Sequence, residues 1–240
     1  MPEGSSAWGF ETWTLVENPN ATRANVTLTY SDYYLAEGGT GYDVGFTTYV
    51  LVQNPGGSPN SVTLTYQTEK GRVAGPSFTM APDSRKTVRV NDQLAPNTDV
   101  STHVHGSRPL VAERSMYWDN GTGTAFHASI GLDEPHMTFM LPDGQTSNGW
   151  ETWTLVENPN PGAVRVKITY LPQNGGTPVS FTDEIAPNSR STYNMADKIH
   201  AGRASILVQS LDGARPIMVE RSMYVNDRGA GMDTIGGFED

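Results

Sequence analysis

The 240-residue chain contains no cysteine, and this absence excludes disulfide frameworks, thiol nucleophiles and cysteine-bound zinc together. The chain also lacks any apolar run near the roughly 20 residues that a membrane-spanning helix needs, so we expect no membrane insertion. Its first residues have neither a basic segment nor an apolar stretch, so we expect no signal peptide in this chain. The compartment has to be inferred from other features.

Basic residues are scarce, with 16 Lys and Arg against 26 Asp and Glu and a formal net charge of -10. Because binding to a phosphate backbone needs clustered basic residues, we expect no nucleic-acid partner. The G-x-S-x-G, G-x-G-x-x-G and P-loop patterns, which position nucleophiles or phosphates, are also absent. We therefore predict a protein that is not an enzyme and uses no cofactor.

Turn-forming residues are abundant, with 25 Gly and 16 Pro distributed along the whole chain. This spacing is too dense for long helices and is typical of short strands joined by turns. The composition therefore predicts an all-β fold.

Internal repeats organise the chain. The run ETWTLVENPN occupies residues 11–20 and recurs letter for letter at 151–160, and a looser version, TYVLVQNPG, occupies 48–56. After the second and third starts the motifs AP-x-SR and ERSMY follow in the same order, and the offset between the copies drifts from 104 residues at the start through 105 at AP-x-SR to 107 at ERSMY. Such small insertions belong in loops, so the last two copies are equivalent modules.

The repeats divide the chain into five parts. We predict a partial repeat at residues 1–32, a linker at 33–45, a module at 46–131, a second linker at 132–149 and a second module at 150–240. The linkers repeat as well, as YYLAEG and FMLPDG, and their apolar residues favour packing against a module rather than free tethers.

Each module has the pattern of a β-sandwich. Val62, Leu64 and Tyr66 alternate with Thr63 and Thr65, the period-2 pattern of a strand with one buried face. In the first module we predict seven strands, near residues 46–53, 61–68, 76–81, 85–90, 98–105, 109–117 and 126–130. The predicted fold is two tandem seven-stranded immunoglobulin-like β-sandwiches preceded by an orphan β-hairpin.

The partial repeat is that hairpin, because its sequence matches only the first two strands of a module. An isolated hairpin is marginally stable in water, so it needs a partner surface. We predict that its apolar side chains form an assembly interface: Phe10, Trp13, Leu15, Val16, Val26, Leu28 and Tyr30.

The motif LV-x-NP followed by an alternating V-x-L-T-Y strand resembles the first hairpin of CARDB-like immunoglobulin-like modules of bacterial and archaeal extracellular proteins. The wider set of YLAEG, GFETW-x-LV-x-NPN, AP-x-SR and ERSMYW is similar to a tandem repeat of large secreted or surface-anchored prokaryotic proteins. The resemblance covers nearly the whole chain and implies an extracellular structural, adhesive or filament-forming role. It supplies no catalytic residue, and the truncated first copy departs from it.

Six charged residues recur at equivalent positions, namely Arg85, Glu113 and Arg114 in the first module and Arg190, Glu220 and Arg221 in the second. The Glu-Arg dipeptide of each module lies in a strongly apolar strand, where adjacent side chains point to opposite faces and cannot form one catalytic dyad. We expect one member to pair with a repeated group such as the AP-x-SR arginine and the other to face water, because buried charges persist when they are paired. We interpret all six as structural charges.

His103 and His105 share one strand face, and a pair of imidazoles at this spacing could ligate zinc or copper. The second module has Leu207 and Gln209 at the equivalent positions, and no third ligand is evident. We therefore predict no metal site.

Tryptophan could mark a sugar-binding surface. Trp13 and Trp153 occupy equivalent strand positions, where a large ring more often belongs to a core or a module interface. Trp118 is the possible glycan contact.

We predict a non-enzymatic extracellular structural or adhesive repeat protein. One form of this role is the subunit of a surface filament that assembles head to tail with copies of itself through the N-terminal hairpin. The alternative is a pair of carbohydrate-binding modules that contact surface glycans through exposed aromatic rings.

Overall fold

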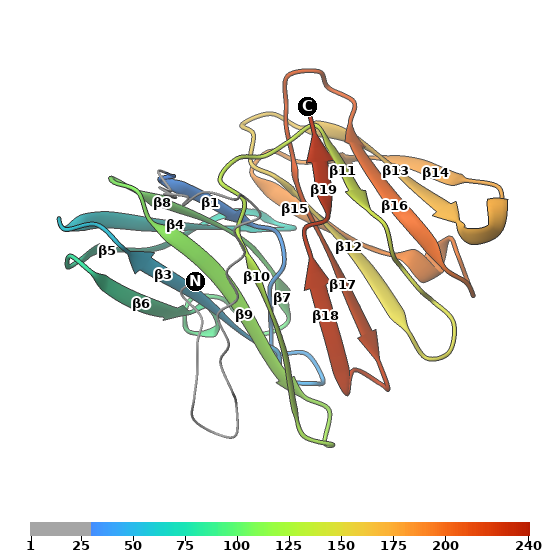
Figure 1. Ribbon diagram of the computed structural model, residues 1–240, viewed down its shortest axis with the longest axis horizontal. Helices are drawn as coiled ribbons and strands as arrows, with labels where there is room; N and C mark the ends of the chain where they lie inside the picture. Colours follow the sequence, from blue (N-terminus) through green and yellow to red (C-terminus); the bar gives the residue numbers. More distant parts are fainter. Residues whose placement is uncertain (1–29) are drawn as a thin grey trace, which may run out of the picture.

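The computed structural model describes residues 30–240, which form an all-β protein of two β-sandwiches (Figure 1). The all-β fold agrees with the prediction, but the sheets of the sandwiches contain eight and nine strands rather than seven each. Tyr30 is the one predicted interface residue of the hairpin in this range, and its carbonyl accepts a hydrogen bond from the Leu110 N–H at 2.9 Å. The hairpin and its other predicted interface residues lie outside the described residues: Phe10, Trp13, Leu15, Val16, Val26 and Leu28. None of the helices in residues 30–240 has the length and apolar character to cross a membrane.

The first sandwich consists of two antiparallel four-stranded sheets, ordered β1-β8-β4-β5 and β10-β9-β3-β6. The first sheet contains β1 (Asp32–Leu35), β8 (Ser101–Gly106), β4 (Asn60–Thr68) and β5 (Gly71–Met80); the second contains β10 (Thr124–Ile130), β9 (Val111–Asp119), β3 (Thr47–Asn54) and β6 (Ser84–Arg89). The short strands β2 (Gly39–Thr40) and β7 (Thr98–Asp99) pair beside them, and η1 (Val90–Asp92) follows β6.

The second sandwich pairs a five-stranded sheet, β14-β13-β16-β11-β19, with a four-stranded sheet, β15-β12-β17-β18. The larger sheet contains β14 (Val179–Ile185), β13 (Val164–Pro172), β16 (Ala204–Ser210), β11 (Thr138–Leu141) and β19 (Gly237–Glu239). The smaller sheet contains β15 (Ser189–Asn194), β12 (Glu151–Asn158), β17 (Met218–Val225) and β18 (Ala230–Thr234), and the helical turns are η2 (Gln173–Gly175) and η3 (Met195–Asp197).

Both segments predicted as linkers supply strands of the sandwiches. β1 pairs with β8 and buries Tyr33 and Leu35, and β11 pairs with β16 and buries Phe139 and Leu141. These strands therefore belong to the sheets that follow them in the sequence, because their alternating apolar side chains can be buried only against the cores.

The alternating patterns of the sequence form the two cores. Val62, Leu64 and Tyr66 are at most 1% exposed, and the equivalent β13 side chains are buried in the second sandwich. Ala36, which follows β1, and Leu132, which follows β10, join the apolar core of the second sandwich. The two cores are thus adjacent rather than separated by a free tether.

A buried asparagine ends the first predicted strand of each module. Asn54 Nδ2 donates to the carbonyls of Ser58 and Ala81, at 2.9 and 2.8 Å. Asn158 Nδ2 donates to the carbonyls of Gly162 and Ala186, at 3.0 and 2.9 Å. The asparagine of the repeated NP motif therefore ends a strand and also links two turns by hydrogen bonds.

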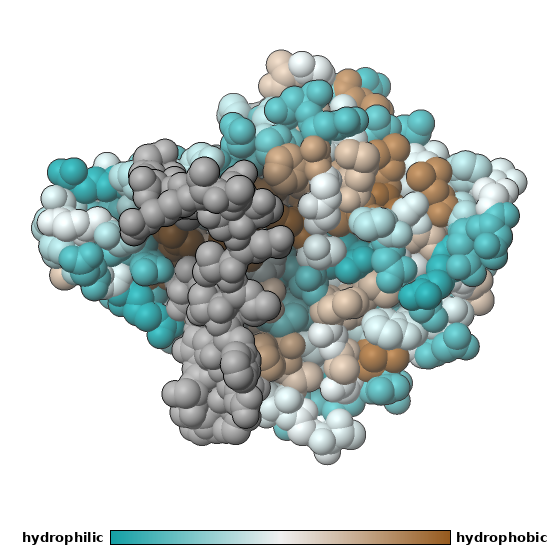
Figure 2. Space-filling view, in the orientation of Figure 1, coloured by the Kyte–Doolittle hydropathy of each residue, from teal (hydrophilic) through white to brown (hydrophobic). Residues whose placement is uncertain are grey.

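The sandwiches meet where β10 of the first lies against β18 of the second (Figure 1), and β15 of the second also contacts β4 and β5 of the first. Phe46, Met116 and Trp118 of the first sandwich form an apolar cluster there with Tyr224 of the second. Elsewhere, apolar side chains gather on the face shown in Figure 2 over the second sandwich, where β11 and β19 form part of the surface.

Candidate functional site at the module junction

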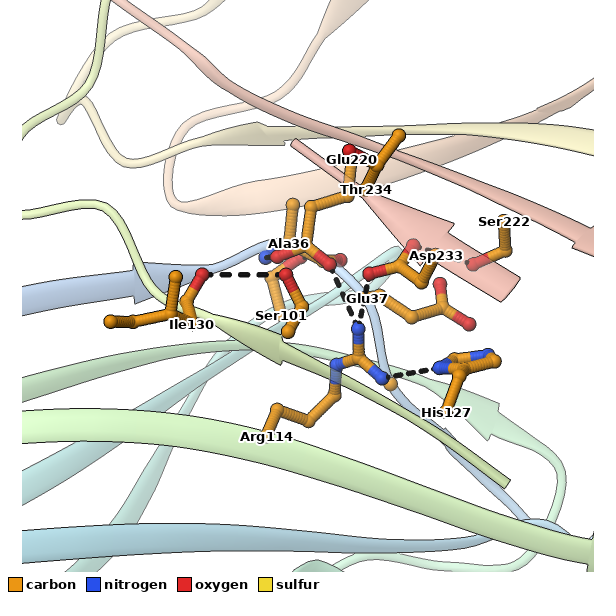
Figure 3. Close-up of polar contacts among 12 residues, drawn as sticks. Ala36, Glu37, Ser101, Arg114, His127, Ile130, Glu220, Ser222, Asp233 and Thr234 are labelled. Carbon is orange, nitrogen blue, oxygen red and sulfur yellow. Dashed lines mark hydrogen bonds and ion pairs between the residues drawn. The ribbon is translucent and has the colours of Figure 1, made fainter. Parts of the chain in front are cut away.

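A buried charge cluster joins the two sandwiches. Arg114 extends from β9 into the junction and is 0% exposed. Its Nη2 donates to Glu220 Oε2 on β17 at 3.0 Å and to Asp233 on β18, and its Nη1 lies 2.8 Å from His127 Nδ1 on β10 (Figure 3). The Ala36 N–H donates to the other oxygen of Glu220 at 2.9 Å. These contacts connect three segments of the first sandwich with two strands of the second.

Burial determines the charge states in this cluster. Burial and the neighbouring Asp233 raise the pKa of Glu220 well above its usual range. Burial opposes ionisation of Asp233 too, but Arg114 and a hydrogen bond with Glu220 hold the pKa of Asp233 below its usual value. Burial, together with Arg114, lowers the pKa of His127 to about 3. The opposite directions of these pKa shifts assign the buried negative charge beside Arg114 to Asp233 rather than to Glu220.

Glu37 lies beside this cluster, in the turn after β1, and is 5% exposed. Its Oε1 accepts a hydrogen bond from the Tyr224 hydroxyl at 3.3 Å, whereas its Oε2 is buried and has no hydrogen-bond partner among residues 30–240. Burial raises the pKa of Glu37 to about 7, although Arg114 opposes the rise. Both charge states of this carboxyl group are therefore populated near neutral pH.

A second arginine also bridges the sandwiches. Arg190 on β15 lies opposite Glu157 on β12, and both are essentially unexposed. Arg190 donates to Thr192 Oγ1 at 3.0 Å and to the Gly38 carbonyl of the first sandwich at 3.4 Å, and its Nη1 lies 3.8 Å from Asp99. Neither oxygen of Glu157 has a hydrogen-bond partner in the described part of the chain, and burial raises the pKa of Glu157 to about 8 against the attraction of Arg190.

Aromatic rings of both sandwiches surround the Arg228 guanidinium group. Its Cζ lies 5.5 Å from the ring centroid of Tyr224, 5.7 Å from that of Phe46 and 5.9 Å from that of Trp153. Arg228 Nη2 also donates to Glu151 Oε2 at 2.9 Å. Ring faces attract cations electrostatically, so the rings and Glu151 together hold this side chain in the junction.

A cavity of about 330 Å³ lies beside these groups. Its walls include the carboxyl groups of Glu37, Glu69 and Asp99, the rings of Tyr42, Phe46, Trp153 and Tyr224, and the Arg228 guanidinium group. Residues 30–240 contain no cluster of three or more side chains suited to a metal ion. The cavity is therefore an aromatic and acidic space of a size suited to a small organic molecule.

The predicted water-facing member of each Glu-Arg dipeptide is not found. Glu113 is 8% exposed, Arg221 is 5% exposed, and the other two members are fully buried. The predicted partners also differ, because Glu220 binds Arg114 of the other sandwich, and Arg221 donates to the Asp143 carbonyl at 2.7 Å. The reason is that the first sandwich covers the face of β17 that we expected to be solvated.

The two AP-x-SR arginines have different environments. Arg190 is buried in the junction, whereas Arg85 is exposed and donates to Thr87 Oγ1 at 3.1 Å. The repeated arginine therefore has a different role in each module, and Arg190 contacts Gly38, Thr192 and Asp99 rather than the Glu-Arg dipeptide that we expected.

Trp118 is not the exposed ring that we expected for a glycan contact. It is 2% exposed, and its indole N–H donates to the Arg228 carbonyl. Gly231 on β18 allows this packing, because a Cβ atom there would lie 2.9 Å from the Trp118 ring. The second sandwich thus covers the ring.

His103 and His105 share a face, as predicted, and both contact one carboxylate oxygen. Asp32 Oδ1 lies 2.9 Å from His103 Nε2 and 2.8 Å from His105 Nδ1. The pairing of β1 with β8 brings Asp32 to these residues, which sequence spacing alone does not predict.

Several junction residues were missed from the sequence. The acidic position shared by Glu37 and Asp143 in the repeated linkers was a usable signal. His127 and Asp233 carried no such signal, because neither is repeated in the other module. The strand register makes Met232 the counterpart of His127 and Ala128 the counterpart of Asp233.

No protein-family model matches the chain, and no curated protein is significantly similar to it. Among solved structures, Thermotoga maritima 1070 is 14% identical, with a TM-score of 0.40, over 44% of this chain and 95% of its own. The Anabaena sensory rhodopsin transducer is 22% identical, with a TM-score of 0.33, over 38% of this chain and 99% of its own. A Streptomyces avermitilis alpha-L-rhamnosidase complexed with L-rhamnose is 10% identical, with a TM-score of 0.25, over 91% of this chain and 27% of its own. At TM-scores this low the likeness carries no functional argument.

Proposed function

We propose that this chain is a non-enzymatic structural or adhesive repeat protein of the cell exterior, in which successive β-sandwiches are held in a fixed relative position. The observation that carries the proposal is the buried contact between Arg114 and Glu220. Both residues belong to the repeated ERSM motif, but they occupy adjacent positions and therefore point to opposite faces of equivalent strands. One motif therefore supplies both partners of the contact between modules. Its arginine contacts the following module, and its glutamate contacts the preceding module.

The arginine and the glutamate of this contact recur at the other ends of the pair. Arg221 holds the arginine position in the second sandwich, and Glu113 holds the glutamate position in the first. The surrounding groups differ, because Pro142 replaces Ala36 and has no N–H, and Met232 and Ala128 stand at the positions of His127 and Asp233. The repetition supports an array that extends beyond two modules, with a modified contact at the second arginine.

The proposal extends to the N-terminal partial repeat. The sequence of residues 11–20 recurs in β12, which pairs with β15 on one side and with β17 on the other. The first copy lacks the AP-x-SR and ERSMY segments that supply these partner strands. We therefore propose that it pairs with a sheet edge of another copy, head to tail, as in strand-addition assembly.

A spin-label distance measurement tests the fixed junction. The absence of cysteine allows labels at two introduced cysteines, Thr63→Cys on the exposed face of β4 and Arg165→Cys on that of β13. A single narrow distance distribution is expected, and Arg114→Ala should broaden it. A control pair within the first sandwich, Thr63→Cys with Lys86→Cys, should remain narrow in both backgrounds. A broad distribution between the sandwiches in the otherwise unaltered chain would contradict the proposal.

Deletion of residues 2–31 tests the assembly. Light scattering and negative-stain microscopy should show polymers of the intact chain and none of the shortened one. Two monomeric proteins of equal stability would reject head-to-tail assembly and leave the fixed pair of modules intact.

A further inference from the structure

We propose that the junction cavity binds a small organic ammonium ion, whose N–H groups donate to the Glu37 carboxylate and whose apolar part lies against the aromatic wall. This inference goes beyond the structural role, since a fixed pair of modules needs no ligand. The two also fail separately, because the spin-label distances do not depend on occupancy of the cavity.

The acceptor is the unpaired oxygen of Glu37. This side chain lines the cavity and is only 5% exposed. Its Oε2 has no hydrogen-bond partner among the described residues. A buried carboxylate oxygen without a donor costs free energy, and a ligand N–H would remove that cost. The neighbouring acid Asp99 is already satisfied, since it accepts from the Tyr42 hydroxyl and from Thr192 Oγ1, each at 2.9 Å. Glu37 is therefore the group that lacks a donor.

The balance of charge in the cavity favours a cation. Three carboxyl groups line it, against the single Arg228 guanidinium group. Glu151 already binds that guanidinium group, at 2.9 Å, and Arg190 lies 3.8 Å from Asp99. Glu37 and Glu69 are therefore the lining carboxyl groups without an ion-pair partner within 4.0 Å among residues 30–240. An ammonium ion adds the missing positive charge and a hydrogen-bond donor in one group.

The aromatic wall favours an organic cation over a bare one. Phe46, Trp153 and Tyr224 all line the cavity and all lie within 6 Å of the Arg228 guanidinium carbon, so these rings already accept one cation. A neutral sugar could also donate hydroxyl groups to Glu37, but it would leave the carboxylate charge unbalanced. The geometry therefore favours the amine.

The test compares three probes of similar shape on the unaltered full chain. Benzylammonium carries charge and N–H donors, benzyl alcohol carries a donor without charge, and benzyltrimethylammonium carries charge without a donor. Binding is followed by isothermal titration calorimetry and by the NMR shift of the Trp153 indole N–H, which reports on the cavity. Benzylammonium should bind at least about tenfold more tightly than either of the other two, as expected when a charge-assisted hydrogen bond forms.

Two variants locate the site. Glu37→Gln keeps the size of the side chain and should lower the benzylammonium affinity at least about tenfold. Glu184→Gln removes an exposed carboxylate of β14 that does not line the cavity, and it should leave the affinity unchanged. The probe series on the unaltered chain needs no variant to fold, so the proposal can be tested even if Glu37→Gln is unstable.

The proposal is overturned if benzylammonium does not bind, if benzyl alcohol binds as tightly, or if Glu37→Gln folds and retains the affinity. Binding of benzyltrimethylammonium at equal strength would also reject it, because the Glu37 hydrogen bond would then contribute nothing.

Discussion

Arg114 Nη2 of the first sandwich lies 3.0 Å from Glu220 Oε2 of the second, although the two residues come from successive copies of one motif. The contact is completely buried, so solvent screens it little. Removal of one buried partner should therefore lower the stability of the chain.

Replacement of Arg114 by methionine should lower the free energy of unfolding by about 3–5 kcal/mol, because it leaves the buried Asp233 carboxylate without its cation. Urea denaturation followed by circular dichroism at pH 7 measures the change. The control is Arg165→Met, whose side chain is 60% exposed and whose replacement should change the stability by less than about 0.5 kcal/mol. Equal effects of the two variants would show that the Arg114 pair does not stabilise the fold.

The two acids that bind Arg114 should respond differently to loss of charge. Glu220→Gln should cost about 1–2 kcal/mol, because burial raises the pKa of Glu220 and disfavours its charge, and the amide oxygen can accept only one of the two hydrogen bonds that Glu220 accepts, from Arg114 and from the Ala36 N–H. Asp233→Asn should cost about 3 kcal/mol or more, because it removes the ionised partner. Urea denaturation of both variants at pH 7 makes the comparison. The reverse order would mean that Glu220, and not Asp233, carries the charge.

Glu157 should make the protein less stable as the pH rises. Its pKa is about 8 in the folded protein and about 4.3 in an unfolded chain, so the folded state binds the extra proton between these values. The contribution of the Glu157 proton to the free energy of unfolding is complete below the unfolded pKa. It decreases by about 1.4 kcal/mol per pH unit until the pH passes the folded pKa. Arg190, on the neighbouring strand, is the cation that opposes this effect.

The pH dependence of Glu157→Gln checks this assignment. The first module has Gln53 at the equivalent position, so the exchange introduces a residue that the repeat already accommodates. Urea denaturation at several pH values from 5 to 8 should give a flatter stability profile for the variant than for the unaltered chain. Parallel profiles would show that Glu157 does not hold a proton in the folded state.

Asn158→Ala should lower the free energy of unfolding by about 1–3 kcal/mol, because it leaves the Gly162, Ile185 and Ala186 carbonyls without their shared donor. Thermal and urea denaturation measure the loss. Gln173→Ala, at an exposed position of η2, is the control and should have little effect. A loss no greater than that of the control would mean that water replaces the amide.

Much of the fold follows from local patterns. The alternation of Val62, Leu64 and Tyr66 with threonines predicted a half-buried strand, and β4 has that strand and that buried face. The linker strands were missed, because Tyr33 and Leu35 are too few to show a period and β1 forms only by pairing with β8, which is distant in the sequence. The sequence pattern thus predicts only those strands that contain enough alternating apolar residues to show a period of two.

The sequence by itself determined two repeated β-sandwiches, their turns and the alternation of residues in their cores. Those features depend on backbone geometry and on side chains a few residues apart. Only the tertiary structure decided that Arg114 meets Glu220 and Asp233, that Trp118 is covered and that Glu37 lines a cavity. The relative position of two sandwiches sets these contacts, and no local period in the sequence encodes that position.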